Sequence, residues 1–83
     1  MYTLEIKKKA QKEIISLPKK DRDRVLVVLE LLKQNPFSGK KLDGQYEGAM
    51  SIRVWPYRII YTIYRDIVTV TVLRVAHRKD VYR

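Results

Sequence analysis

Apolar residues change their spacing along the chain, and each spacing predicts a different element. Residues 2–6 alternate between apolar and polar side chains, which is the period of a half-buried strand. From Lys8 onward, Ala10, Ile14 and Leu17 recur at helical spacing. That helix ends near Leu17, because Pro18 disfavours the α conformation in the residue before it. The chain therefore begins with a strand followed by a helix.

A second helix is predicted between the corner at residues 17–20 and Asn35. Its core stripe consists of Val25, Val28, Leu29 and Leu32. Three further apolar residues, Leu26, Val27 and Leu31, extend the apolar surface around most of the circumference. A helix this apolar lies between two layers or binds a partner segment.

The rest of the chain reads as a glycine-containing loop followed by three strands. Residues 37–49 contain all three glycines of the chain and are predicted to be a loop. Alternating or β-branched patterns then cover residues 50–54, 58–65 and 67–75, with turns at residues 56–57 and 65–66. This order predicts an α+β fold in which two N-terminal helices pack on one face of a mostly antiparallel four-stranded sheet, the other face being open.

Strand parity separates the arginines of the predicted sheet. Arg53 alternates with Ile52 and Val54, and Arg58 is out of phase with the apolar positions of its strand, so both point away from the helices. Arg74 has instead the parity of the predicted core face of Val68, Val70 and Val72. The strand therefore bulges or ends before Arg74, or Arg74 lies at the rim.

The composition gives the chain a strong positive charge. The residue type that carries this charge changes from lysine to arginine along the chain. The formal charge is +9 and the pI is about 10.0, which favours polyanionic partners such as RNA. Residues 1–49 contain nine Lys and two Arg, whereas residues 50–83 contain six Arg and one Lys. Arginine binds phosphate oxygens two at a time. The C-terminal sheet therefore has the composition of a phosphate-binding site.

Absences in the composition narrow the class of protein. There is no cysteine and only one histidine, so a disulfide framework and a thiolate zinc site are excluded. No apolar run approaches the roughly 18 residues that cross a bilayer. We expect one domain over residues 1–83, in a soluble cytoplasmic protein without membrane contact.

Three segments in this order resemble the RelE/ParE superfamily of toxin-antitoxin toxins: LPKKDRDRVLVVLELLKQNPFSGKKLDG, then YRIIYTI, then RVAHRKDVY. The similarity covers nearly the whole chain and is greatest to the RelE branch. It implies a RelE-like β-α-α-β-β-β fold and an mRNA endoribonuclease, an mRNA interferase that inhibits translation, usually at the ribosome. It also implies a cognate RelB-like antitoxin as partner, with operator DNA bound through the antitoxin complex.

The resemblance assigns roles to particular positions. Arg58 matches the family's phosphate-contacting arginine, Arg78 its second functional arginine, and Tyr82 a C-terminal tyrosine involved in the chemistry or in base stacking. Where well-known members have two lysines, this chain has Ser51 and Arg53, so only Arg53 retains the positive charge.

The implied chemistry is transesterification by the RNA 2′-OH, which needs proton transfer and stabilisation of a phosphorane. Arg53, Arg58 and Arg78 are candidates for the electrostatic part but cannot act as bases. His77 and Tyr82 are the candidates for proton transfer, and neither a metal nor a cofactor is required. The alternatives are solvated arginines on an open sheet, an exposed surface histidine, a ParE-like poison of DNA gyrase, and an inactive toxin-fold binding module.

Overall fold

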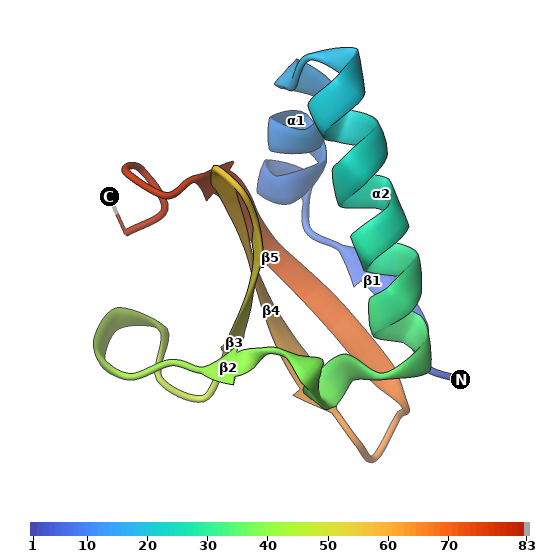
Figure 1. Cartoon of the computed structure of the whole chain (residues 1–83). Helices are drawn as coiled ribbons and strands as arrows, with labels where there is room; N and C mark the ends of the chain where they lie inside the picture. The colour runs from blue at the N-terminus through green and yellow to red at the C-terminus, as the bar shows by residue number, and fades with distance from the viewer. Residues whose placement is uncertain (83) are drawn as a thin grey trace.

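The computed structural model describes residues 1–82 of the chain. Two helices lie side by side on one face of a twisted sheet (Figure 1). The elements are β1 (Thr3–Ile6), α1 (Lys8–Ser16), α2 (Lys19–Gln34), the 3₁₀ turn η1 (Pro36–Ser38), β2 (Lys40–Lys41), the 3₁₀ turn η2 (Gly44–Tyr46), β3 (Met50–Val54), β4 (Tyr57–Tyr64) and β5 (Thr69–His77). Within residues 1–82, no helix is both long and apolar enough to span a membrane.

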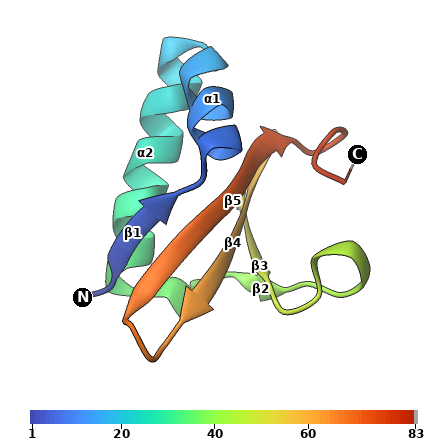
Figure 2. The ribbon, with the colours of Figure 1, turned by 180° about the vertical axis from the view of Figure 1, so that it is seen from behind.

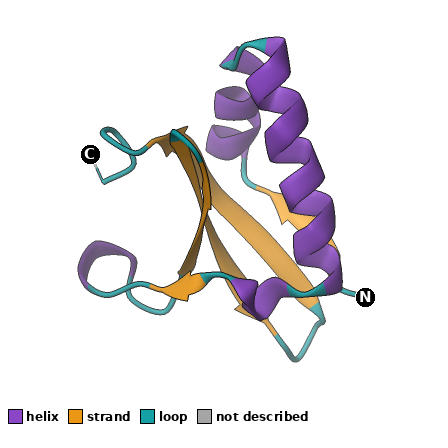
Figure 3. Ribbon diagram, in the orientation of Figure 1, coloured by secondary structure: helices purple, strands orange, loops and turns teal. Residues whose placement is uncertain are grey.

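The sheet has the strand order β1-β5-β4-β3-β2. β1 runs parallel to β5, and the other neighbours are antiparallel, so the predicted α+β class is confirmed (Figure 3). The predicted number of four strands is wrong, because β2 adds a fifth strand at the edge beside β3. Its two residues are both lysines, so no alternation of apolar and polar side chains marks this strand in the sequence.

The main core lies between the helices and the sheet. It is formed by Ala10, Ile14, Val25, Leu29 and Leu32 from the helices and by Met50, Val54, Ile59, Tyr61, Val70, Val72 and Val75 from the strands. The predicted outer apolar positions of α2 are indeed exposed. In the core the Tyr61 hydroxyl donates a 2.7 Å hydrogen bond to the Pro36 carbonyl, and burial raises the pKa of Tyr61. A Cβ atom at residue 39 would collide with this hydroxyl, so only glycine fits at this position.

The face of the sheet away from the helices is only partly open. A second apolar cluster on this face contains Ala49, Ile60, Ala76 and Val81, with Leu42, Tyr46 and Leu73 packed against it. The segment around η2 and the turn after β5 lie on this side of the sheet in both ribbon views (Figures 1 and 2). The prediction of an open second face is therefore wrong where these two segments cover it.

A β-bulge in β5 resolves the position of Arg74. Tyr61 pairs with Val72, but its neighbour Ile60 pairs with Arg74, which leaves Leu73 without a partner on β4. The extra residue shifts Arg74 from the helix-facing side to the side of the second cluster. Parity left open a bulge, a strand end before Arg74, or a rim position for Arg74. The bulge is confirmed.

The residues before β5 differ from the prediction. Val68 was predicted to share a strand face with Val70 and Val72, and this is wrong. Its φ of 49° and its exposed fraction of 45% place Val68 in the turn. Its N–H donates to the Arg65 carbonyl at 3.2 Å, so β5 begins only at Thr69. A β-branched residue rarely adopts this backbone conformation, and the apolar alternation gave no sign of it.

Candidate nucleic-acid interface

Arg53 and Arg58 lie directly opposite each other on β3 and β4. Arg58 also pairs with Ala76 of β5, so both arginines share the face of the second cluster, as predicted from parity. Arg53 is exposed and Arg58 is half-buried. Like charges at directly opposed positions repel each other. The pair therefore concentrates positive charge at one place on the sheet.

No carboxylate neutralises this charge within the described residues. The ion pairs among residues 1–82 use Lys7, Lys19, Arg24, Lys33 and Arg74 as cations. None of the three arginines predicted to bind phosphate is among them. Their guanidinium groups keep a full positive charge and a planar set of donors, which suits an anion with several oxygens.

Ser51, two residues before Arg53, contributes no charge to this face. It is only 4% exposed and pairs with Ile60 on one side and Lys40 on the other. Its hydroxyl has no hydrogen-bond partner among the described residues. The positive charge of β3 therefore comes from Arg53 alone.

Arg78 lies at the same end of the sheet, one residue after β5. Its N–H donates to the carbonyl of Pro56, in the turn between β3 and β4, at 2.9 Å. Its guanidinium lies over the ring of Trp55, with Cζ 4.7 Å from the ring centroid. Arg24 of α2 donates to the Trp55 carbonyl at 2.9 Å, which holds the turn against the helix. Trp55 thus orients Arg78 by a cation–π contact.

Tyr82 lies in the C-terminal turn, residues 78–82. The N–H groups of Asp80 and Val81 both donate to the His77 carbonyl, and the buried Val81 anchors the turn in the second cluster. Tyr82 itself is 46% exposed, and its ring lies against that of Tyr46 with centroids 5.9 Å apart. The tyrosine is therefore placed on the same side of the sheet as Arg53 and Arg58, with an accessible ring.

His77 is placed differently from the other predicted site residues. It pairs with Tyr57, next to the Arg58–Ala76 pair, so alternation puts it on the helix-facing side. The rings of His77 and Tyr57 meet edge to face at 6.0 Å, and His77 Nδ1 accepts the Lys79 N–H at 3.2 Å. The Tyr57 hydroxyl donates to Asp21 of α2 at 3.1 Å, and burial, together with this bond, raises the pKa of Tyr57.

Sequence reasoning missed a buried polar cluster behind the C-terminal turn. Arg74, only 8% exposed, donates from Nη2 to Glu13 Oε2 at 2.8 Å and from Nε to both oxygens of that carboxylate. Its Nη1 donates to Tyr46 Oη at 3.3 Å and to the Val81 carbonyl at 3.2 Å. The bonds to Glu13 raise the pKa of Arg74 above its ordinary value. The one sign of this cluster in the sequence is that Arg74, a charged residue, has the parity of the predicted core face.

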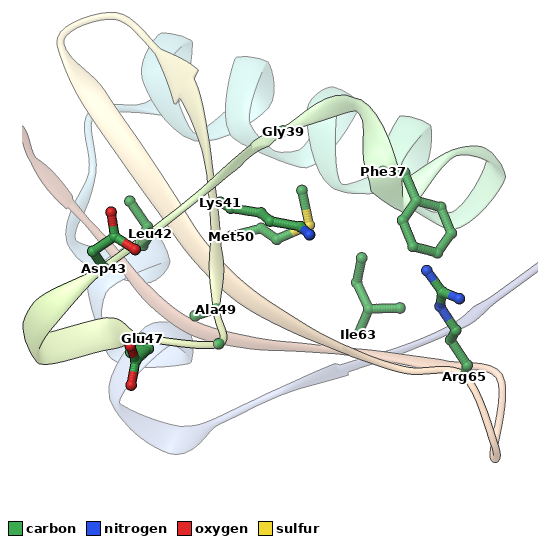
Figure 4. A pocket seen from close by; sticks show the side chains of 11 residues that line it. Phe37, Gly39, Lys41, Leu42, Asp43, Glu47, Ala49, Met50, Ile63 and Arg65 are labelled. Atoms are coloured by element: carbon green, nitrogen blue, oxygen red, sulfur yellow. The ribbon is translucent and has the colours of Figure 1, made fainter.

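A pocket of about 640 Å³ lies elsewhere on the molecule (Figure 4). It is lined by Phe37, Gly39, Lys41, Leu42, Asp43, Glu47, Gly48, Ala49, Met50, Ile63 and Arg65. Arg65, the first residue after β4, lies seven residues beyond Arg58, which is about 23 Å at the usual strand rise. No predicted site residue lines this pocket. Within residues 1–82, no group of three potential His, Asp or Glu ligands could hold a metal ion.

The fold is that of a small α+β protein with two helices on one face of a five-stranded sheet and, on the other, two arginines that form no ion pair among residues 1–82. The chain belongs to the family described as ParE toxin of type II toxin-antitoxin system, parDE, whose model matches residues 4–82. Within the RelE/ParE superfamily it is a RelE-like toxin.

Known relatives agree in sequence and in fold. Toxin RelG of Mycobacterium tuberculosis is 35% identical over 88 residues, covering 99% of this chain and 97% of RelG. The RelBE2 toxin-antitoxin complex of the same organism contains a chain with a TM-score of 0.85 and 32% identity, covering 93% of this chain and 98% of that one. The isolated RelE toxin of E. coli has a TM-score of 0.81 and 26% identity, covering 99% of this chain and 92% of RelE.

Proposed function

We propose that this toxin is a metal-independent endoribonuclease, an mRNA interferase that inhibits translation by cutting message presented by the ribosome. The observation that supports this most is the opposed pair Arg53 and Arg58, which has no carboxylate partner among residues 1–82. Two like charges held together at a cost in repulsion favour an anionic ligand. A phosphodiester has the charge and the oxygens that this pair of guanidinium groups can bind.

The reaction is an internal transesterification. The 2′-oxygen forms a bond to phosphorus and loses its proton, while the bond from phosphorus to the 5′-oxygen breaks and that oxygen gains a proton. The products are a 2′,3′-cyclic phosphate and a 5′-hydroxyl. Arg53, Arg58 and Arg78 stabilise the negative charge that grows on the phosphorane oxygens, which is the largest contribution that such a site makes.

For the protons we favour Tyr82 over His77. Tyr82 is accessible and lies on the arginine side of the sheet, where it can reach a bound nucleotide or stack on its base. His77 lies on the other side, and its Nδ1 already accepts a hydrogen bond. If the ribosome aligns the 2′-oxygen with phosphorus, positioning supplies much of the acceleration and one modest acid-base group suffices.

The test is to map cleavage ends on a reporter message in a purified translation reaction, with and without ribosomes. Wild-type protein is expected to create new 5′-hydroxyl ends, and the Arg53→Ala/Arg58→Ala variant is expected to create almost none. Lys12→Ala/Lys33→Ala, which removes two positive charges from α1 and α2, is the matched control and should cut normally. Intact message at high protein concentration would overturn the proposal.

The same reaction separates the alternatives that the sequence leaves open. A ParE-like gyrase poison would leave the message intact, but cleaved DNA would accumulate when the toxin is added to purified gyrase. An inactive binding module does neither. The family model is named for ParE, so the gyrase reaction is the appropriate second assay.

We also propose a RelB-like antitoxin as partner, bound in the cytoplasm and carrying the toxin to operator DNA. The apolar outer side of α2, with Leu26, Val27 and Leu31 exposed by 44%, 60% and 61%, is the surface that a partner segment would cover. Hydrogen exchange should show added protection of α2 in the complex. Unchanged exchange along α2 would contradict this placement.

A further inference from the structure

The carboxylate of Glu13, from α1, lies against the edge of β5, beyond the point where the neighbouring strand β1 ends. The last pair between β1 and β5 is Ile6 with Val72, so the backbone of β5 beyond Val72 has no strand on that side. The Val75 N–H there donates to Glu13 Oε1 at 2.9 Å. The same carboxylate accepts the Nε and Nη2 donors of Arg74. α1 thus fixes both the edge of β5 and the orientation of one guanidinium.

The free end of that guanidinium points to the C-terminal turn. Arg74 Nη1 donates to the Val81 carbonyl at 3.2 Å and to Tyr46 Oη at 3.3 Å, and the Tyr46 hydroxyl also donates to the Val81 carbonyl at 3.3 Å. Val81 is the residue before Tyr82, and the ring of Tyr46 lies against that of Tyr82. Arg74 therefore reaches Tyr82 by two routes, through the backbone and through the ring of Tyr46.

We infer that Arg74, oriented by Glu13, is a positioning residue for Tyr82 in RNA cleavage. The inference rests on the proposed function, to which it adds residues that touch neither RNA nor the reacting atoms. A buried ion pair adds little net stability relative to apolar replacements of similar size, and some such pairs instead specify one arrangement. The arrangement here is that of the turn which carries Tyr82.

Arg78 is held independently of this cluster, which makes the inference specific. Its N–H bonds to the Pro56 carbonyl, and its guanidinium lies on Trp55. Neither contact involves Glu13 or Arg74. Loss of the Arg74 bonds should therefore release the end of the turn and Tyr82 while leaving Arg78 in place.

Arg74→Lys is the first variant, because one ammonium can still pair with Glu13 but cannot also span to the Val81 carbonyl. The apolar pair Glu13→Leu/Arg74→Met is the second, in case the first does not fold. In a single-turnover cleavage assay we expect a loss of about tenfold in wild-type and Arg78→Ala backgrounds, but of less than about twofold in the Tyr82→Ala background. Equal losses in all three backgrounds would overturn the inference. Glu30→Leu/Lys33→Met, which removes an ion pair on α2, is the matched control for the apolar pair.

Amide hydrogen exchange tests the positioning role of Arg74 without RNA. The amides of Asp80 and Val81, bonded to the His77 carbonyl, should exchange about tenfold faster in either variant, while the Arg78 amide, bonded to Pro56, stays unchanged. Unchanged exchange at Asp80 and Val81 would overturn the positioning role. If the wild-type protein cuts no RNA, the proposed function fails, and this exchange pattern still supports or overturns the role of Arg74.

Discussion

Arg58 and Arg74 lie on the same face of the same sheet, yet their surroundings are opposite. Arg58 pairs with Ala76, and Arg74 pairs with Ile60, two positions further along β4. Arg58 is half-buried, faces another arginine and has no ion pair among residues 1–82. Arg74 is almost completely buried and uses all three of its nitrogens on partners within the chain. One residue type thus serves two purposes.

The difference follows from what lies next to each strand. β5 runs beyond the end of β1, and α1 packs there with Glu13 in reach of Arg74. At Arg58, β4 is paired on both sides, and the residues opposite Arg58 are an arginine and an alanine. A satisfied guanidinium organises the protein, whereas an unsatisfied one is available to a ligand.

The largest effect should come from removing the partner of the buried arginine. Glu13→Ala leaves the Arg74 guanidinium and the Val75 N–H without their acceptor, which should lower the free energy of unfolding by about 3–5 kcal/mol. Urea unfolding measures this loss. A loss below about 1 kcal/mol, or no larger than that of Lys33→Ala, would mean that Glu13 is not needed at this edge.

Arg78→Ala should separate activity from stability. We expect the cleavage rate to fall by about 10²-fold, because one donor to the phosphorane is lost. The melting temperature should stay within a few degrees, because Arg78 is exposed and its backbone bond to Pro56 remains. Fluorescence of Trp55, the single tryptophan, should also change when the cation leaves its ring. A parallel fall in rate and melting temperature would contradict this separation.

Alkaline pH should weaken the hydrogen bonds of two tyrosine hydroxyls, those of Tyr61 and Tyr57. The pKa values of Tyr61 and Tyr57 are raised above 10.0 in the folded protein, so the unfolded chain releases these protons first. Stability from both groups is fully present below about pH 10 and is lost as pH rises through their folded pKa values. Tyr61→Phe should cost about 1 kcal/mol at neutral pH and flatten this loss. If Tyr61→Phe loses stability with rising pH as steeply as the wild type, the Tyr61 hydroxyl is not the cause of that loss.

The smallest effect should come from Arg53→Ala. Removing one of two opposed charges should change stability by no more than about 0.5 kcal/mol, in the stabilising direction. RNA binding should weaken, and its slope against the logarithm of salt concentration should decrease by about 0.7–1. Lys33→Ala, which removes the same charge from α2, is the control. An unchanged slope would place Arg53 outside the RNA contact.

Much of the fold was predictable because periodicity marks it directly. The two helices and β1, β3 and β4 follow from apolar spacing, and parity placed Arg53 and Arg58 on the correct face. β2 was not predictable, because its two lysines have no apolar pattern. The cover formed by η2 and Val81 comes from contacts between segments far apart in the sequence. The bulge at Leu73 appeared in the sequence only as the parity conflict of Arg74.

The candidate site was predictable in its residue types more than in its arrangement. Arg53, Arg58, Arg78 and Tyr82 were singled out, and they lie on one side or at one end of the sheet. Parity also determines the place of His77, but its contacts with Tyr57 and the Lys79 N–H depend on the turn after β5. Glu13 and Tyr46 were missed, because a buried ion pair between α1 and β5 leaves no local pattern.

The most direct test of the account measures message cleavage and melting temperature on the same preparation of Arg58→Ala. The account predicts a cleavage rate about 10²- to 10³-fold below wild type in the presence of ribosomes, with an unchanged melting temperature. Cleavage by Arg58→Ala at the wild-type rate would contradict it, since Arg58 would then have no part in the chemistry.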